Sequence, residues 1–183
     1  MLQLILTLLA ILILAVLVLG YLWPDKVHVE RETVINAPPE KIFGLISDFV
    51  EWDKWSPWAK LDPDAKYEFS GDGVGQRMAW SSEKREVGSG SQEIIAMQPP
   101  RQLVTALDFG EMGGARATFD IAAMGEASKV VWALDTNMRE GVPTLKQPMA
   151  TFFGFFMDKM IGKSYEEGLA NLKEVAEAPS QSA

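Results

Sequence analysis

Few side chains in this sequence could support nucleophilic or metal chemistry. His28 is the sole histidine of the chain, and there is no cysteine. A zinc site with the usual nitrogen and sulfur ligands needs several such residues, and a serine or cysteine nucleophile needs a histidine close to it. We therefore predict no metal and no cofactor, and catalytic residues stay unassigned.

Acidic residues give weaker signals. The Asp-Pro-Asp sequence at 62–64 and nearby Asp72 could gather a cation, but the proline breaks the spacing of a calcium-binding loop, so we favour solvated loop carboxylates. Asp120 and Asp135 could approach each other on adjacent strands, but the apolar–polar alternation puts both on the polar face of a sheet. The Gly71–Gly75 segment lacks the helix and the Lys-Ser/Thr pair of a phosphate loop, so a hairpin turn explains it better.

Bulky apolar side chains form the main candidate for a binding site. Aromatic and methionine side chains make adaptable pocket linings with few hydrogen-bonding demands, although the same side chains could simply fill a solid core. Trp52, Trp55 and Trp58 recur every third residue, which suits a structural clamp, a cavity mouth or a membrane-facing surface. The predicted ligand-binding residues are Trp55, Trp58, Met78, Trp80, Phe119, Trp132, Phe153, Phe156, Met157 and Met160.

Two periodicities would aim these residues at one space. Apolar residues recur at helical spacing over 148–175, with charged residues on the opposite side, which predicts one long helix. The sequence also predicts a strand over 27–36, a helix that begins within 36–40, and a short helix over 50–55 that ends before Pro57. Six further strands separated by turns are predicted at 67–70, 76–81, 90–97, 103–109, 116–124 and 129–138.

This order of elements, and two stretches of sequence, resemble the SRPBCC or START-like superfamily, in particular its polyketide cyclase/dehydrase and lipid-transport group. The stretches are Val29–Phe43 with Trp52–Trp58, and Met157–Lys173, which is similar to the closing helix of a membrane-anchored subset. The resemblance covers about Val27 to Val175. It implies an α+β helix-grip fold, in which a curved antiparallel sheet grips a long C-terminal helix over a hydrophobic cavity. A fold of this kind does not by itself define a reaction.

The first 24 residues predict a single transmembrane anchor. From Leu2 to Trp23 only Gln3, Thr7 and Gly20 interrupt an apolar run, which as a helix is long enough for a hydrocarbon core of about 30 Å. The run has neither the basic start nor the small-x-small site of a cleaved signal peptide, so we expect an uncleaved, single-pass anchor.

The rest of the chain predicts one globular domain over 25–175 and a disordered Ala/Pro/Ser tail over 176–183. All charged residues lie in this part, and the net charge of −8 argues against nucleic acid as a partner. The side of the membrane stays open. Lys26, Arg31 and Lys41 favour the cytoplasm by the positive-inside rule, and a chain without cysteine fits either compartment.

The sequence therefore favours a membrane-anchored protein that binds a hydrophobic small molecule or lipid in an internal cavity. One alternative is a cyclase- or dehydratase-like enzyme in which Arg77, Arg116, Asp108 or Tyr165 faces the cavity. The other is an accessory protein of the chaperone-activator kind, whose contact surface is the charged side of the C-terminal helix. Protein partners are not predicted.

Overall fold

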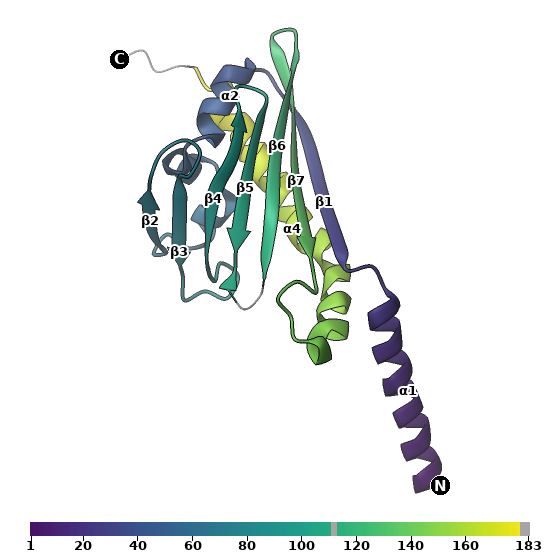
Figure 1. The fold of residues 1–183 in the computed structure, drawn as a ribbon. Coiled ribbons are helices and arrows are strands. Elements are labelled where there is room, and N and C mark those ends of the chain that lie inside the picture. Colours follow the sequence, from purple (N-terminus) through teal and green to yellow (C-terminus); the bar gives the residue numbers. More distant parts are fainter. Residues whose placement is uncertain (111–112, 180–183) are drawn as a thin grey trace.

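The computed structural model describes residues 1–110 and 113–179 and consists of an apolar helix that projects from a curved sheet (Figure 1). Helix α1 (Leu2–Leu22) is apolar and long enough to span a membrane, and its most hydrophobic window is not buried by the rest of the protein. The remaining elements, in chain order, are β1 (Lys26–Ile35), α2 (Pro39–Ile46), η1 (Phe49–Lys54), α3 (Pro57–Leu61), β2 (Lys66–Ser70), β3 (Arg77–Ser81), β4 (Ser89–Gln98), β5 (Gln102–Asp108), β6 (Gly114–Met124), β7 (Ala127–Asn137), η3 (Thr144–Lys146) and α4 (Gln147–Glu177).

All seven strands form one antiparallel sheet in the order β1-β7-β6-β5-β4-β3-β2, so the first strand pairs with the last. The expected alternation holds: Phe119 lies opposite Trp132, and Ala117 lies opposite Leu134, with all four side chains buried on the inner face. Asp120 and Asp135 are exposed on the outer face, as predicted. They are not a pair, because Asp120 lies opposite Val131 and Asp135 lies opposite Arg116.

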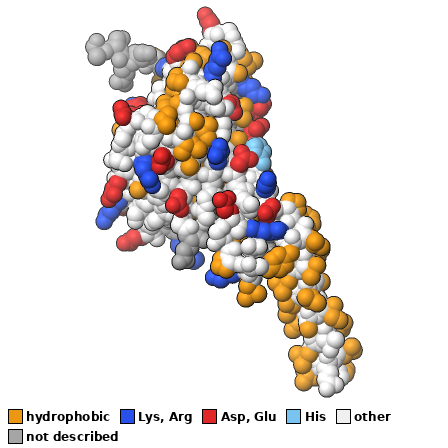
Figure 2. All heavy atoms as spheres, viewed as in Figure 1, with side chains coloured by type: hydrophobic (Ala, Val, Ile, Leu, Met, Phe, Trp, Pro, Cys, Tyr) orange, Lys and Arg blue, Asp and Glu red, His pale blue; other side chains and the backbone are white. Residues whose placement is uncertain are grey.

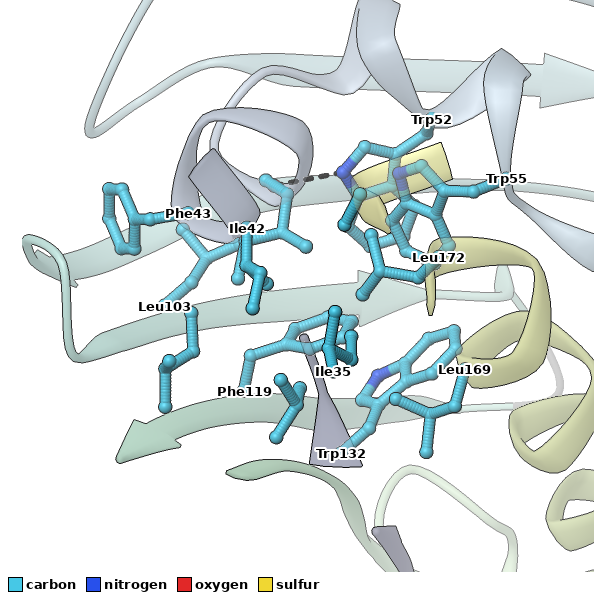
Figure 3. Close-up of a cluster of buried hydrophobic side chains, with 14 of the residues drawn as sticks. Ile35, Ile42, Phe43, Trp52, Trp55, Leu103, Phe119, Trp132, Leu169 and Leu172 are labelled. Atoms are coloured by element: carbon cyan, nitrogen blue, oxygen red, sulfur yellow. Dashed lines mark hydrogen bonds between the residues drawn. The ribbon is translucent and has the colours of Figure 1, made fainter. Parts of the chain in front are cut away.

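Helix α4 crosses the inner face, and its C-terminal half closes the core (Figure 1). The Tyr165 ring stacks on Trp132 with 3.8 Å between ring centroids and 10° between ring planes. Leu169 and Leu172 are buried in the same core, with Leu169 next to Trp132 (Figure 3). The helix ends at Glu177, two residues beyond the predicted helix, with Ala176 buried; residues 180–183 of the predicted tail lie outside the described residues.

The segment between the first helix of the domain and β2 differs from the prediction. A 3-10 helix, η1, stands where a short helix is predicted, and a further helix, α3, begins at Pro57. The proline is tolerated because the first helical position has no intrahelical partner for its N–H. The Trp52 and Trp55 indole nitrogens donate to the carbonyl oxygens of Ile46 and Leu45, over 2.8 and 2.9 Å. Both indoles therefore cap the C-terminal end of α2 and fix η1 against it.

Arg31 on β1 fixes α4 to the edge of the sheet. Its guanidinium donates to Asp158 over 3.0 Å and to Glu166 over 2.7 Å, both on α4. The guanidinium lies against Gly162, where an added Cβ would overlap it. The glycine therefore leaves room for the Arg31 guanidinium on the surface of α4.

Candidate functional site

The space between the sheet and the C-terminal half of α4 is filled by the protein's own aromatic side chains. Three of the predicted ligand-binding residues, Trp55, Phe119 and Trp132, are at most 1% exposed there (Figure 3). The Phe119 and Trp132 rings stack at 4.6 Å, and the Trp55 ring meets both at close to a right angle. Trp58, partly buried, packs against the edge of Trp132. The structure brings these four residues together, but they pack against one another in the core and do not line a cavity.

The predicted residues on the N-terminal half of α4 lie in a different place. Phe153, Phe156 and Met160 are each about half exposed, and Met157 is partly buried against the core. Trp80 on β3 is also partly buried, and its ring lies against Gly90, its partner on β4. The structure therefore distributes the predicted set over a packed core, an exposed face of α4 and the inner face of β3.

A hollow with an apolar lining lies between η1, α3 and the inner face of β2 and β3, and we call it the apolar pocket. Its volume is about 300 Å³. Among the predicted residues, only Met78 lines it. Its full lining is Phe49, Val50, Trp52, Asp53, Ser56, Ala59, Tyr67, Phe69 and Met78.

Register and hydrogen bonds explain how the pocket is built. Phe69 lies opposite Met78, so the alternation of β2 and β3 turns both side chains to the inner face. The Gln76 side chain, just before β3, accepts from the Phe49 backbone N–H over 3.0 Å and donates to Asp48 over 2.9 Å. This buried amide fixes the start of η1 to the residue that precedes β3.

A second set of contacts fixes α3, which forms one side of the pocket, to the turn after β3. Asp62 follows this helix, is 5% exposed, accepts from the Ser82 hydroxyl over 2.5 Å and pairs with Lys84 over 3.4 Å. The hydrogen bond from Ser82 is the main reason why the pKa of the Asp62 carboxyl is lowered. The prediction of a solvated carboxylate is therefore wrong for Asp62, which is a buried anchor between α3 and the turn after β3.

The pocket offers few polar groups. Burial raises the pKa of the Tyr67 phenol, with a smaller contribution from the charges of Asp53 and Asp62, so the phenol stays protonated and able to donate at physiological pH. Ser56 is 8% exposed and lies on the same lining. This arrangement suits an apolar guest with one hydrogen-bond acceptor at its edge.

A larger hollow of about 680 Å³ lies at the end of the sheet near the loops after β5 and β7. It is open, and several of its side chains are charged, among them His28, Asp108, Arg116 and Asp135. His28 Nδ1 lies 2.8 Å from Asp135, and this hydrogen bond is the main cause that raises the His28 pKa. We take the apolar pocket as the candidate binding site, because a wide, charged hollow would not desolvate an apolar ligand.

The residues considered for an enzyme are not gathered in the apolar pocket. Arg77, Asp108 and Arg116 are exposed, and their strand positions place them on the outer face. Tyr165 is buried against Trp132. Within the described residues, no group of three or more histidine, cysteine or acidic side chains could hold a metal ion.

Sequence reasoning missed most of the pocket lining, including Phe49, Val50, Tyr67 and Phe69. The alternation of Tyr67 and Phe69 with polar residues was a usable signal, because residues two apart on a strand share a face. The contribution of η1 was not readable, because it depends on the hydrogen bonds of Gln76 with Asp48 and Phe49.

Comparisons with known proteins agree with this architecture. The family model described as polyketide cyclase/dehydrase and lipid transport matches residues 26–177, and the chain belongs to this family. No curated protein matches the chain at a significant level. The family fold suggests binding of a hydrophobic ligand.

Solved structures of low sequence identity share the fold. The Aha1 dimer from Colwellia psychrerythraea aligns with a TM-score of 0.57 and 17% identity, over 84% of this chain and 98% of that chain. A solution structure from Thermobifida fusca aligns with a TM-score of 0.60 and 15% identity, over 81% and 92%. Ara h 8.0201 aligns with a TM-score of 0.55 and 13% identity, over 82% and 97%. The START-like helix-grip fold predicted from the sequence is confirmed.

Proposed function

We propose that this protein is a single-pass membrane protein that binds a hydrophobic small molecule or a lipid in its apolar pocket. The observation that carries the proposal is the pocket itself, which is lined mainly by aromatic and aliphatic side chains and lies at the surface of a protein with an apolar helix. Residues 1–24 would form the anchor, and the binding domain would run from residue 25 to the end of α4 at Glu177.

The pocket volume limits the guest. A volume of about 300 Å³ is at the lower end of the range of about 300–1,000 Å³ that is usual for ligand sites. It suits a small ring compound or one part of an acyl chain better than a whole phospholipid. The Tyr67 phenol would donate to a carbonyl or hydroxyl oxygen of the guest.

Photocrosslinking tests the proposal in the full chain. Protein in nanodiscs is incubated with a palmitate that carries a diazirine, irradiated, digested and mapped by mass spectrometry. We expect crosslinks to η1 and to β2 or β3, at residues such as Trp52, Tyr67 and Met78. Crosslinks confined to α1 would mean that the probe meets the protein only within the bilayer, and the pocket assignment would be rejected.

A variant that fills the pocket provides the specific control. Ala59 lines the pocket, and Ala59→Trp should abolish the crosslinks to η1 and β3. Ala122 is exposed on the outer face of β6, so Ala122→Trp adds the same side chain away from the pocket and should leave the crosslinks unchanged. Thermal unfolding of both variants establishes that each is folded. Equal crosslinking in the two variants would exclude this pocket.

A further inference from the structure

An exposed apolar stripe runs along the N-terminal half of α4. Met149, Phe153, Phe156 and Met160 are spaced four, three and four residues apart, so they lie on one face of the helix. Their exposed fractions are 78%, 49%, 60% and 54%. Leu145, in η3 just before the helix, is 85% exposed. We call these five residues the α4 stripe.

The stripe differs from the rest of the helix. The C-terminal half of α4 buries Tyr165, Leu169 and Leu172 against the sheet, whereas the described residues leave about half or more of each stripe side chain exposed. Large exposed apolar side chains that gather in one place mark an interaction surface. The location of the stripe indicates what it contacts.

Helix α1 packs against the face of α4 that adjoins the stripe. An added Cβ on Gly20 would lie 2.6 Å from the Pro148 Cβ and 3.1 Å from the Phe152 ring, so glycine permits close approach of the two helices. The Trp23 and Phe155 rings lie 4.9 Å apart. The start of α4 is therefore level with the last turn of α1, where Tyr21 and Trp23 are the aromatic residues expected at a membrane surface.

Hydrogen bonds hold this arrangement. Arg139 donates to the carbonyl oxygens of Gly20, Tyr21 and Trp23 over 3.0, 3.0 and 2.6 Å. The Tyr21 hydroxyl donates to the Thr144 carbonyl oxygen over 2.6 Å. The domain is thus fixed to the end of α1, and the tip formed by η3 and the start of α4 is held beside it. Figure 2 shows hydrophobic side chains over α1 and also at the adjoining end of the domain.

Charge distribution favours a lipid surface over a second copy of this acidic chain. The protein as a whole has a net charge of −8, yet residues 139–164 hold four basic and two acidic side chains. One of the two acids, Asp158, pairs with Arg31, which lowers the pKa of its carboxyl. Lys146, Lys159 and Lys163 remain exposed around the stripe, a composition that suits anionic head groups.

We infer that the α4 stripe is a second membrane contact, in which η3 and the first turns of α4 insert into the head-group region of the bilayer that holds α1. The inference rests on the proposed function, because it requires α1 to span that bilayer. The domain then contacts the membrane through both α1 and the α4 stripe, and these two contacts fix its orientation. An amphipathic helix face buried to about 5–10 Å is typical of such contacts.

Site-specific quenching tests this contact, and a chain without cysteine permits clean labelling. Single variants Met149→Cys, Phe156→Cys, Leu12→Cys and Ala122→Cys of the full chain carry an environment-sensitive fluorophore. Each is placed in vesicles of phosphatidylcholine and phosphatidylglycerol with spin-labelled lipids. We expect head-group spin labels to quench Met149→Cys and Phe156→Cys, acyl-chain spin labels to quench Leu12→Cys, and neither to quench Ala122→Cys.

The four positions separate failure of the inference from failure of the anchor. If Leu12→Cys is quenched while both stripe positions behave like Ala122→Cys, α1 spans the membrane and the second contact does not exist. If Leu12→Cys is not quenched, the anchor is wrong and the inference is overturned with it. Stripe positions that are shielded only as protein density rises would assign the stripe to a contact between two copies, which also overturns it.

Discussion

Rings packed around Trp132 leave little freedom at neighbouring positions of α4. The Trp132 ring is held between Tyr165 and Phe119, and Gly168 passes directly over its edge. Among the described residues, the Trp132 indole nitrogen and the Thr105 hydroxyl are buried without a hydrogen-bond partner. The close packing at Gly168 and the unpaired hydroxyl of Thr105 each affect the free energy of unfolding.

Gly168→Ala is expected to destabilise the protein. An added Cβ would lie 2.8 Å from the Trp132 ring and 3.1 Å from Pro57, and neither ring can turn away. Overpacking of this kind costs about 1–3 kcal/mol, which exceeds the gain of about 1 kcal/mol from alanine in a helix. The measurement is the free energy of unfolding in urea. Gly44→Ala in α2 is the control, because its Cβ meets nothing within 4 Å, and it should be stabilising.

Thr105→Val is expected to stabilise the protein by about 1 kcal/mol, because it replaces a buried, unpaired hydroxyl with a methyl group of the same shape. Thr151→Val is the matched control. The Thr151 hydroxyl is buried too, but it donates to Gln147 and accepts from Arg139, so its loss should cost about 1 kcal/mol. Equal unfolding free energies of Thr105→Val and the parent would contradict the assignment of an unpaired hydroxyl.

Among the elements, strands and the long helix followed from periodicity, because their side chains alternate between a packed and a solvated face. The predicted ends of β1, β6 and α4 are within two residues of the observed ends. Helix α3 was missed because Pro57 reads equally as a stop and as a first helical residue. The apolar pocket was missed because its position depends on tertiary hydrogen bonds, above all those of Gln76. Periodicity identified inward-facing aromatic residues, but it could not tell a filled space from an empty one.

The pairing of β1 with β7 contributes a small pH dependence. The His28 pKa is raised above its ordinary value of 6.5, chiefly by the hydrogen bond to Asp135, with Glu30 also nearby. The fold therefore favours the protonated imidazole. Its contribution is fully present below pH 6.5 and is lost as the pH rises through the raised pKa.

Asp135→Asn should lower the His28 pKa, which is measured by NMR titration of the ring protons. Both side chains are more than half exposed, so the stability lost between acidic and mildly alkaline pH should be about 0.5 kcal/mol or less. The variant should show almost none of this loss. Glu126→Gln, in the turn after β6, is a control for the general loss of one negative charge. An unchanged titration in Asp135→Asn would contradict the contact.

At the scale of the whole molecule, the orientation of the domain relative to α1 depends on a few contacts. Only residues 23–25 separate α1 from β1. A linker of this length restricts reach but leaves its dihedral angles free to rotate. Arg139 removes that freedom. It donates to carbonyl oxygens in the last turn of α1 that accept no hydrogen bond from within the helix. Its Nε also donates to Thr151 of α4 over 3.0 Å, which joins both helices through one side chain.

Arg139→Ala should therefore release the domain without unfolding it. Spin labels at Leu12→Cys in α1 and Ala122→Cys in β6 report the distance between the two parts by pulsed electron spin resonance in nanodiscs. We expect one narrow distribution in the parent and a broad one in Arg139→Ala, with the unfolding temperature of the domain little changed. Lys146→Ala, at an exposed site in the same tip, should keep the narrow distribution. A broad distribution in the parent would mean that α1 and the domain are not fixed to each other, because the hydrogen bonds of Arg139 and the Trp23–Phe155 contact would then be too weak to hold one orientation.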